Sequence, residues 1–198
     1  MRKVSRTVDH EELEKLGEFP LIELFQREQT DLVFKEIYRR YCPLVYGYLK
    51  RCAYHARETV IEELTDDVFI SVHRNIGGIK NIAGFRSWIC RISHNICVNY
   101  FKKKKEICLD TEASERIQDE RIDIEAGPVR DEMNESIHEE IGKFDPLTRE
   151  IIVLKCYQDL THEEISGVLK IPVRKIKYLL KKAVIRMHQN LKKEDLMP

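Results

Sequence analysis

Long apolar runs are absent from this 198-residue sequence. None approaches the roughly 20 residues that a membrane-spanning helix needs, and the basic N-terminus is not followed by the apolar stretch of a secretory signal. We therefore expect a cytoplasmic protein with no membrane partner. The six cysteines lack the paired spacing of a disulfide framework, and in a reducing compartment they are expected to stay thiols.

Motifs for catalysis are missing as well. The chain has no glycine loop that would cradle a phosphate, no zinc-protease histidine pair and no nucleophile elbow. Its carboxylates crowd between residues 106 and 142, where no apolar period predicts a folded pocket. We expect no catalytic residue, no metal and no bound cofactor, and a protein that is not an enzyme.

Glycine and proline are scarce, at 8 and 6 residues, so helices can run with few interruptions. Apolar residues recur at helical spacing, and the predicted fold is all-α, with two small helical domains. For the first domain, residues 19–105, we expect a helix after Pro20, an amphipathic pair interrupted near Pro43, a helix closed by Gly77 and Gly78, and another from Gly84 to the lysines at 102–105.

The net charge of zero is a sum of opposed blocks. Residues 68–105 carry 8 basic and no acidic side chains, whereas residues 106–142 carry 3 basic and 13 acidic ones. A stretch without carboxylates can present a continuous positive face to nucleic-acid phosphates, although such a face is also compatible with simple solvation. The acidic block predicts a flexible linker. Residues 1–18 are then an N-terminal extension and residues 194–198 a tail.

The second unit, residues 143–193, is predicted to be a helix-turn-helix. Thr161 to Glu164 has the pattern of a capping box, and Pro172 breaks the chain before a long helix. In such a motif the second helix enters the major groove. The candidates for duplex contacts are the outward polar side chains of that helix: Arg174, Lys175, Lys177, Tyr178, Lys181 and Lys182. A helical hairpin with a solvated basic face is the alternative.

The basic stretch of the first unit also contains aromatic residues. Cationic tracks with rings on which bases stack are typical of proteins that bind single strands. Phe85 and Trp88, however, lie on an apolar helical stripe, which favours a role in the core. Cys90, His94 and Cys97 share one helical face and could hold zinc or sense redox state, but no fourth ligand is evident, and buried helical thiols explain the pattern more simply.

These motifs resemble the sigma-70 family of bacterial initiation factors, in its small extracytoplasmic-function type. The runs that carry the resemblance to sigma domain two are Phe34–Tyr41, Asp66–His73, Phe85–Asn95 and Asn99–Lys105, and those for domain four are Leu160–Ser166 and Ile171–Val173. The resemblance implies an alternative sigma factor, a non-catalytic DNA-binding subunit that gives RNA polymerase its promoter choice. Its two domains would read the minus-ten and minus-thirty-five promoter elements.

The resemblance also implies roles for particular residues. The residues expected to contact the melted minus-ten strand and its upstream duplex are Lys80, Asn81, Arg86, Trp88, Arg91, Asn95, Asn99, Lys102, Lys103, Lys104 and Lys105. Docking on the beta-prime clamp helices of the polymerase falls to Asp66, Asp67, Phe69 and Ile70. The polymerase beta flap, promoter DNA in duplex and melted form, and an anti-sigma factor are the other expected partners. The linker either threads the polymerase cleft or is a spacer.

The second unit departs from the family pattern. The family usually has glycine where Lys170 stands, and small or polar residues and an arginine where Arg174, Tyr178 and Leu179 stand. We therefore expect an unusual minus-thirty-five sequence, weak reading of that element, or dependence on a recruiting partner. The competing interpretation is a helix-turn-helix regulator that binds duplex DNA without being a polymerase subunit.

Overall fold

The computed structural model describes residues 10–54, 56–110 and 139–194. Every regular element in these ranges is helical, which confirms the all-α class. The elements are α1 (His10–Lys15), α2 (Glu18–Glu28), α3 (Asp31–Cys52), α4 (Glu58–Asn75), the 3-10 turns η1 (Ile76–Gly78) and η2 (Ile82–Gly84), α5 (Phe85–Asp110), α7 (Pro146–Cys156), α8 (His162–Leu169) and α9 (Val173–Glu194).

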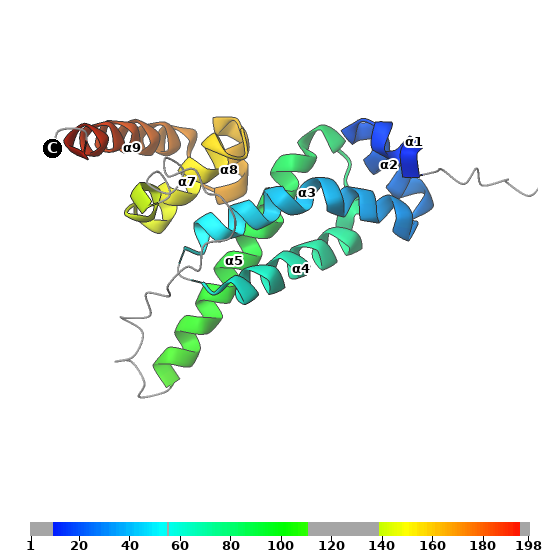
Figure 1. Cartoon of the computed structure of the whole chain (residues 1–198), viewed down its shortest axis with the longest axis horizontal. Helices are drawn as coiled ribbons and strands as arrows, with labels where there is room; N and C mark the ends of the chain where they lie inside the picture. The colour runs from blue at the N-terminus through cyan, green and yellow to red at the C-terminus, as the bar shows by residue number, and fades with distance from the viewer. Residues whose placement is uncertain (1–9, 55, 111–138, 195–198) are drawn as a thin grey trace, which may run out of the picture.

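The first unit is a bundle in which α3, α4 and α5 pack on one another, with α1 and α2 at one end (Figure 1). Its centre is apolar: Ile37, Val45, Val68 and Ile89 are fully buried. Within each helix the buried residues recur at helical spacing, as Ile37, Tyr41 and Val45 do in α3, so each helix turns one apolar stripe inward. Helix α1, which lies before residue 19, belongs to this packing too, because its Leu13 is only 1% exposed.

The helix break expected near Pro43 is wrong, because α3 runs without interruption from Asp31 to Cys52. Proline lacks an N–H, so the turn at Pro43 lacks one helical hydrogen bond. The residues on both sides of it, Tyr41 and Val45, are buried in the core. Tertiary packing therefore overrides the local preference of proline.

The end expected for the last helix of the first unit is also wrong. Helix α5 continues past the lysines at 102–105 to Asp110. No glycine or proline interrupts this stretch, and lysine and glutamate are good helix formers. Most of the expected linker, residues 111–138, lies outside the described residues, and residues 139–142 are again helical. In Figure 1 the C-terminal half of α5 extends beyond the bundle.

The second unit contains the predicted helix-turn-helix. The Thr161 hydroxyl accepts from the Glu164 amide, and the Glu164 carboxylate accepts in return from the Thr161 amide, so the capping box is confirmed. Helix α9 then starts directly after Pro172, with Ile176 and Ala183 buried as expected. The sequence did not reveal that Asp145 caps α7, where its side chain accepts from the Thr148 amide.

The two units pack against each other. Helix α7 lies on α3 and α8 lies on α5, so one hydrophobic cluster includes buried residues from both units, among them Val45 and Ile151. We call this the closed arrangement. Among the described residues, no helix is both long and apolar enough to cross a bilayer.

Candidate nucleic-acid interface

Helix α5 displays a polar stripe along its exposed side. Arg91, Asn95, Asn99 and Lys102 follow one another at spacings of four, four and three residues, so their side chains share one face of the helix. All four are exposed, and so are Lys103 and Lys104. The side chain of Lys105 lies outside the described residues. The stripe contains no carboxylate and can therefore follow a phosphate backbone.

A hollow of about 320 Å³ opens at the N-terminal end of this stripe. The segment between η1 and η2 forms one wall, and the first two turns of α5 form the other. Its lining residues are Gly78, Ile79, Lys80, Asn81, Gly84, Ser87, Trp88 and Arg91. Four of them were expected from the sequence to contact the minus-ten strand. Concave sites of this size suit a small planar group with a few polar partners around it.

The two aromatic residues at the start of α5 have different surroundings. Phe85 is fully buried and meets Tyr41 edge-on, with ring centroids 4.8 Å apart, so it belongs to the core. Trp88 is half-buried, stacks on Phe85 at a centroid distance of 5.6 Å, and also lines the hollow. One part of the indole is therefore held by the core while another part is open to a ligand.

Helix α9 presents the second basic surface. Its six candidate residues, Arg174, Lys175, Lys177, Tyr178, Lys181 and Lys182, are all exposed. Tyr178 has 63% of its surface exposed, which is unusual for an aromatic side chain without a partner. Leu179, in contrast, is half-buried and packs against the core, so its apolar character serves packing and takes no place on the outer face.

Lys170 ends α8 in a left-handed conformation, with φ 55° and ψ 41°. A side chain with a Cβ pays roughly 1–2 kcal/mol for this conformation, and glycine does not. We expect Lys170→Gly to stabilise the second unit by about 1 kcal/mol in urea unfolding. Lys170→Ala is the control, because it removes the lysine side chain but keeps the Cβ. Equal stabilisation by both variants would contradict this explanation.

The interface between the units contains part-buried polar contacts that centre on Glu150 of α7. Its carboxylate accepts a hydrogen bond from the Tyr48 hydroxyl on α3, and one of its oxygens lies 2.6 Å from Nδ1 of His94 on α5. Burial holds the pKa of Tyr48 well above its usual value, which keeps the hydroxyl as a donor. The Gln158 amide adds a hydrogen bond of 3.2 Å to the Leu44 carbonyl.

The closed arrangement engages two of the residues expected to bind DNA. Arg86 Nη1 donates to the Gln158 carbonyl at 3.4 Å. Arg91 lies so close to Gly167 of α8 that a Cβ on that glycine would meet Nη2 at 3.2 Å. Two cation-π contacts add to the interface: Arg51 lies 4.0 Å above the Tyr157 ring, and Arg149 lies 5.3 Å above the Tyr54 ring.

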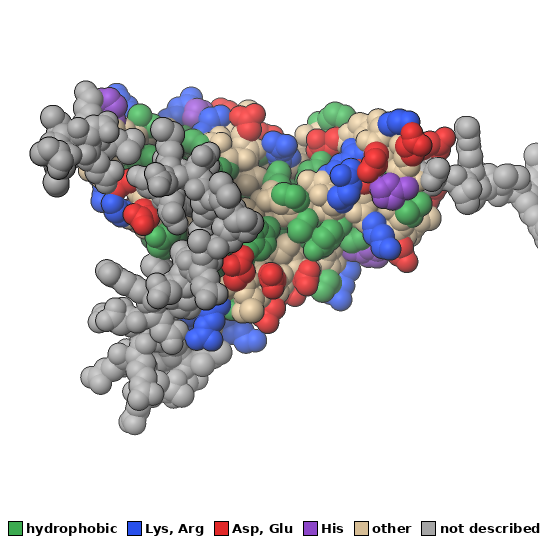
Figure 2. All heavy atoms as spheres, viewed as in Figure 1, with side chains coloured by type: hydrophobic (Ala, Val, Ile, Leu, Met, Phe, Trp, Pro, Cys, Tyr) green, Lys and Arg blue, Asp and Glu red, His purple; other side chains and the backbone are tan. Residues whose placement is uncertain are grey.

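A second hollow, of about 420 Å³, lies between α3 and α4. Of the four expected docking residues, Asp66, Phe69 and Ile70 line it, whereas Asp67 is exposed but does not. Phe69 is buried, and its ring centroid lies 4.4 Å from that of Tyr38, while Ile70 is 48% exposed. Figure 2 shows acidic side chains gathered over α4, beside hydrophobic ones over α3. The sequence did not single out Tyr38, His73 or Arg74 as further lining residues.

Cys90, His94 and Cys97, the residues that could hold zinc, do not form a group of possible ligands in the described part of the chain. Within the ranges that the structure describes, the only three ligand-type side chains with atoms within 4.8 Å of one another are His10, Glu14 and Glu36. His94 is engaged by Glu150, and burial raises the pKa of both Cys90 and Cys97 to about 12, so these thiols are protonated. Neither metal binding nor redox sensing is favoured at this position.

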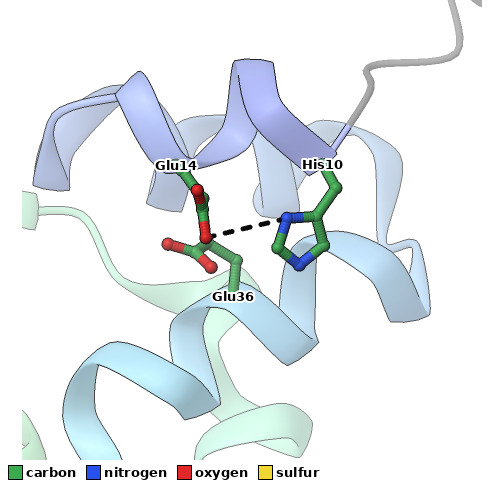
Figure 3. Close-up of side chains that lie close together, drawn as sticks. All are labelled: His10, Glu14 and Glu36. Atoms are coloured by element: carbon green, nitrogen blue, oxygen red, sulfur yellow. Dashed lines mark ion pairs between the residues drawn. The ribbon is translucent and has the colours of Figure 1, made fainter.

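His10 and Glu14 of α1 lie beside Glu36 of α3, and His10 pairs with Glu14 within α1 (Figure 3). Arg39 binds the Glu36 carboxylate through two nitrogens, at 2.8 and 2.9 Å, and Arg40 adds a contact of 2.5 Å. Arg40 also donates to the carbonyls of Leu13, Glu14 and Leu16. Two guanidinium groups already neutralise Glu36, so the cluster has little charge left for a cation.

The acid stability of the protein is expected to depend on Glu36. The hydrogen bond from Arg39, helped by Arg40, outweighs burial and lowers the pKa of Glu36 from 4.5 to about 2. Because the folded pKa lies below the unfolded one, its stabilisation is complete above pH 4.5 and is lost as the pH falls toward 2. We expect Glu36→Gln to cost on the order of 2 kcal/mol at neutral pH.

Urea unfolding at several pH values measures the loss of stability and its pH dependence. The difference in unfolding free energy between wild type and Glu36→Gln should shrink below pH 4.5. Glu14→Gln is the control, because the Glu14 side chain is 46% exposed and its ion pair with Arg39 is long, at 3.7 Å. An exposed pair of this kind contributes at most about 1 kcal/mol. A pH-independent difference would rule out the ion pair as the cause.

Comparisons with known proteins identify the family of both units. Residues 37–107 match the model of sigma-70 region 2, and residues 134–187 match that of sigma-70 region 4. The chain is 22% identical to the RNA polymerase sigma factor YlaC of Bacillus subtilis over 164 residues, which covers 80% of this chain and 92% of YlaC. It is 28% identical to the ECF RNA polymerase sigma factor SigW of the same species, with 73% and 81% covered.

The fold is also found among solved structures. The sigma factor RpoE of Bartonella quintana, crystallised in complex with the anti-sigma factor NepR, superposes with a TM-score of 0.66. The match covers 80% of this chain and 96% of RpoE at 14% identity. At this identity the similarity establishes the fold alone.

Proposed function

Because the chain belongs to the sigma-70 family, as a member of its extracytoplasmic-function type, we propose that it binds core RNA polymerase and directs it to promoters through the two basic surfaces described above. We assign sigma domain two to the unit α1–α5, with residues 19–105 as its centre. Domain four is assigned to residues 143–193, extended by the helical residues 139–142. The segment between them is the linker.

The polar stripe of α5 and the hollow beside Trp88 are proposed to hold the melted minus-ten strand. The observation that carries this proposal is the position of the hollow, at the end of an exposed stripe without carboxylates. An unstacked base that enters the hollow would meet the indole together with Lys80 and Asn81. Stacking on an aromatic side chain contributes roughly 1–3 kcal/mol, which offsets the cost of extruding the base.

The outer face of α9 is proposed to read the minus-thirty-five duplex. Its lysines and Arg174 would contact phosphates and base edges, and the Tyr178 ring would make an apolar contact, such as that with a thymine methyl group. The half-buried Leu179 removes one reason to expect weak reading, since it takes no place on this face. A recruiting partner is needed only if the holoenzyme does not select strong promoters unaided.

The hollow between α3 and α4 is proposed as the docking site for the polymerase clamp helices. Its lining combines the exposed apolar Ile70 with Asp66 and Arg74, and Figure 2 shows further acidic side chains over α4, a pattern that suits a partner with both apolar and charged side chains. The beta flap is the proposed contact of domain four. As a polymerase subunit the protein would act in the cytoplasm and would have no catalytic residue of its own.

The closed arrangement does not reach both promoter elements at once. The minus-ten and minus-thirty-five elements lie about 25 base pairs apart, or about 85 Å at 3.4 Å per base pair. Arg91 of domain two and Gly167 of domain four are in contact here. We propose that the two domains separate when the protein joins the polymerase. An anti-sigma factor, as in the complex of RpoE with NepR, is a proposed partner that would hold them inactive.

In vitro transcription tests the proposal. Purified protein is added to bacterial core polymerase with a library of genomic fragments, and new RNA start sites are mapped. Starts that share a spaced pair of upstream motifs are expected. Duplex binding without new starts would instead favour a regulator that acts without being a polymerase subunit.

A further inference from the structure

Gln26 of α2 makes two hydrogen bonds that none of the expected functions explains. Its side-chain amide nitrogen donates to the Ile76 carbonyl and to the Ile79 carbonyl, both at 2.9 Å. These carbonyls bracket Gly77 and Gly78, at the start of the segment that forms one wall of the minus-ten hollow. The two contacts join residues 50 and 53 positions apart in the chain.

The orientation of the Gln26 amide follows from its partners. Both are backbone carbonyl oxygens, which can only accept, so the nitrogen with its two hydrogens has to face them. One side chain therefore satisfies two acceptors on η1 and its cap. Both hydrogen bonds are part-buried, with Ile76 fully buried and Ile79 half-buried, so loss of the amide would leave two partly shielded carbonyls without this donor.

Apart from Gln26, the segment is held by the buried Ile76 and by Ile79, which packs against the core. Gly77 and Gly78 have no side chains to anchor them, and a Cβ on Gly78 would meet nothing within 4 Å. The regular backbone bond of this turn is the one from the Ile79 amide to the Ile76 carbonyl, at 3.3 Å. Ile79, Lys80 and Asn81 follow directly and line the hollow. Their position thus depends on where the turn before them is fixed.

We infer that Gln26 is a positioning residue, which pre-forms the base-capturing wall of the hollow without touching DNA itself. This inference rests on the proposed role of the hollow in holding a minus-ten base. If the wall is already ordered, binding of a base does not include the free-energy cost of ordering it. The Gln26 amide therefore contributes to affinity and to base selectivity. Loss of the two N–H donors of Gln26 should leave the structure of α9 and of the α3–α4 hollow unchanged.

The test uses Gln26→Met, which is close to glutamine in length and lacks both donors. Holoenzyme with wild-type or variant protein is titrated with a single-stranded minus-ten oligonucleotide, its sequence taken from mapped start sites, and with versions altered at each base. We expect about tenfold weaker binding, which equals about 1.4 kcal/mol, and a smaller preference among bases. Affinity for core polymerase and for a duplex minus-thirty-five fragment should not change. Gln189→Met, at an exposed position of α9, is the matched control.

The outcomes separate this inference from the proposed function. If the wild type selects no base, the proposed function fails and the inference fails with it. If the wild type is selective and Gln26→Met is equally selective, only the inference is overturned. A parallel loss of core binding would also overturn it, in favour of a general role in folding.

A second measurement needs neither DNA nor polymerase. Amide hydrogen exchange at residues 77–81 of the full-length protein should be about tenfold faster in Gln26→Met, while exchange in α3 stays as in the wild type. Unchanged exchange in this segment would show that Gln26 does not hold it.

Discussion

Glu150→Lys is expected to separate the two domains and to raise the affinity of the free protein for single-stranded minus-ten DNA by about tenfold or more. The wild-type carboxylate accepts from Tyr48 and contacts His94, which lie on different helices of domain two. Lysine offers no acceptor, so the buried Tyr48 hydroxyl is left without its partner, at a cost of roughly 1–3 kcal/mol. The new positive charge also faces His94 and the neighbouring Arg149.

The gain in DNA affinity follows from the release of Arg86 and Arg91. In the closed arrangement Arg86 donates to Gln158, and Arg91 lies against Gly167. A ligand that binds only the open form has an apparent affinity reduced by the fraction of open molecules. A destabilisation of the closed form by about 1–3 kcal/mol raises that fraction by roughly 5- to 150-fold while it remains small.

Two measurements check this expectation. Energy transfer between dyes on α5 and α9 should fall when the domains separate, and anisotropy of a labelled oligonucleotide should report tighter binding. Glu150→Gln is the matched control, because its amide oxygen can still accept from Tyr48, and it should change both signals less. A Glu150→Lys protein with wild-type energy transfer and wild-type DNA affinity would mean that Glu150 does not hold the domains together.

The helical class and the helix-turn-helix were predictable because they depend on local patterns. A capping box such as Thr161 to Glu164 acts over three residues, and the spacing of Ile176 and Ala183 reflects one face of one helix. The sequence misled at Pro43 because the packing that keeps α3 continuous comes from distant residues. The helix propensity of a residue predicts little where the residues before and after it are buried in the core.

The candidate surfaces were predictable in composition but not in shape. The absence of carboxylates between residues 68 and 105 was visible in the sequence, whereas the hollow beside Trp88 needs two segments to meet in space. The roles of Gln26 and Glu150 were missed altogether. Each joins residues at least 50 positions apart, and one glutamine or glutamate within a helix carries no local signal.

Ile70→Asp is expected to weaken binding to core polymerase by about 100-fold. Ile70 is 48% exposed at the rim of the α3–α4 hollow, where Phe69 and Tyr38 form an apolar floor. Loss of a hot-spot residue of a protein interface costs roughly 2–4 kcal/mol, and we expect Ile70 to be such a residue because it is the exposed aliphatic side chain at this hollow. An aspartate would also add a carboxylate beside Asp66, which has to be desolvated when the partner docks.

Leu32→Asp is the matched control for this prediction, since it also places an aspartate at an exposed aliphatic side chain of the same domain, 41% exposed, at a position that does not line the hollow. Titration of labelled protein with core polymerase measures both affinities. Because Ile70 projects from the bundle surface, its replacement should leave the unfolding free energy within about 0.5 kcal/mol of wild type. A core affinity within twofold of wild type for Ile70→Asp would move the docking site away from this hollow, whereas loss of affinity in that variant alone assigns core docking to the hollow between α3 and α4.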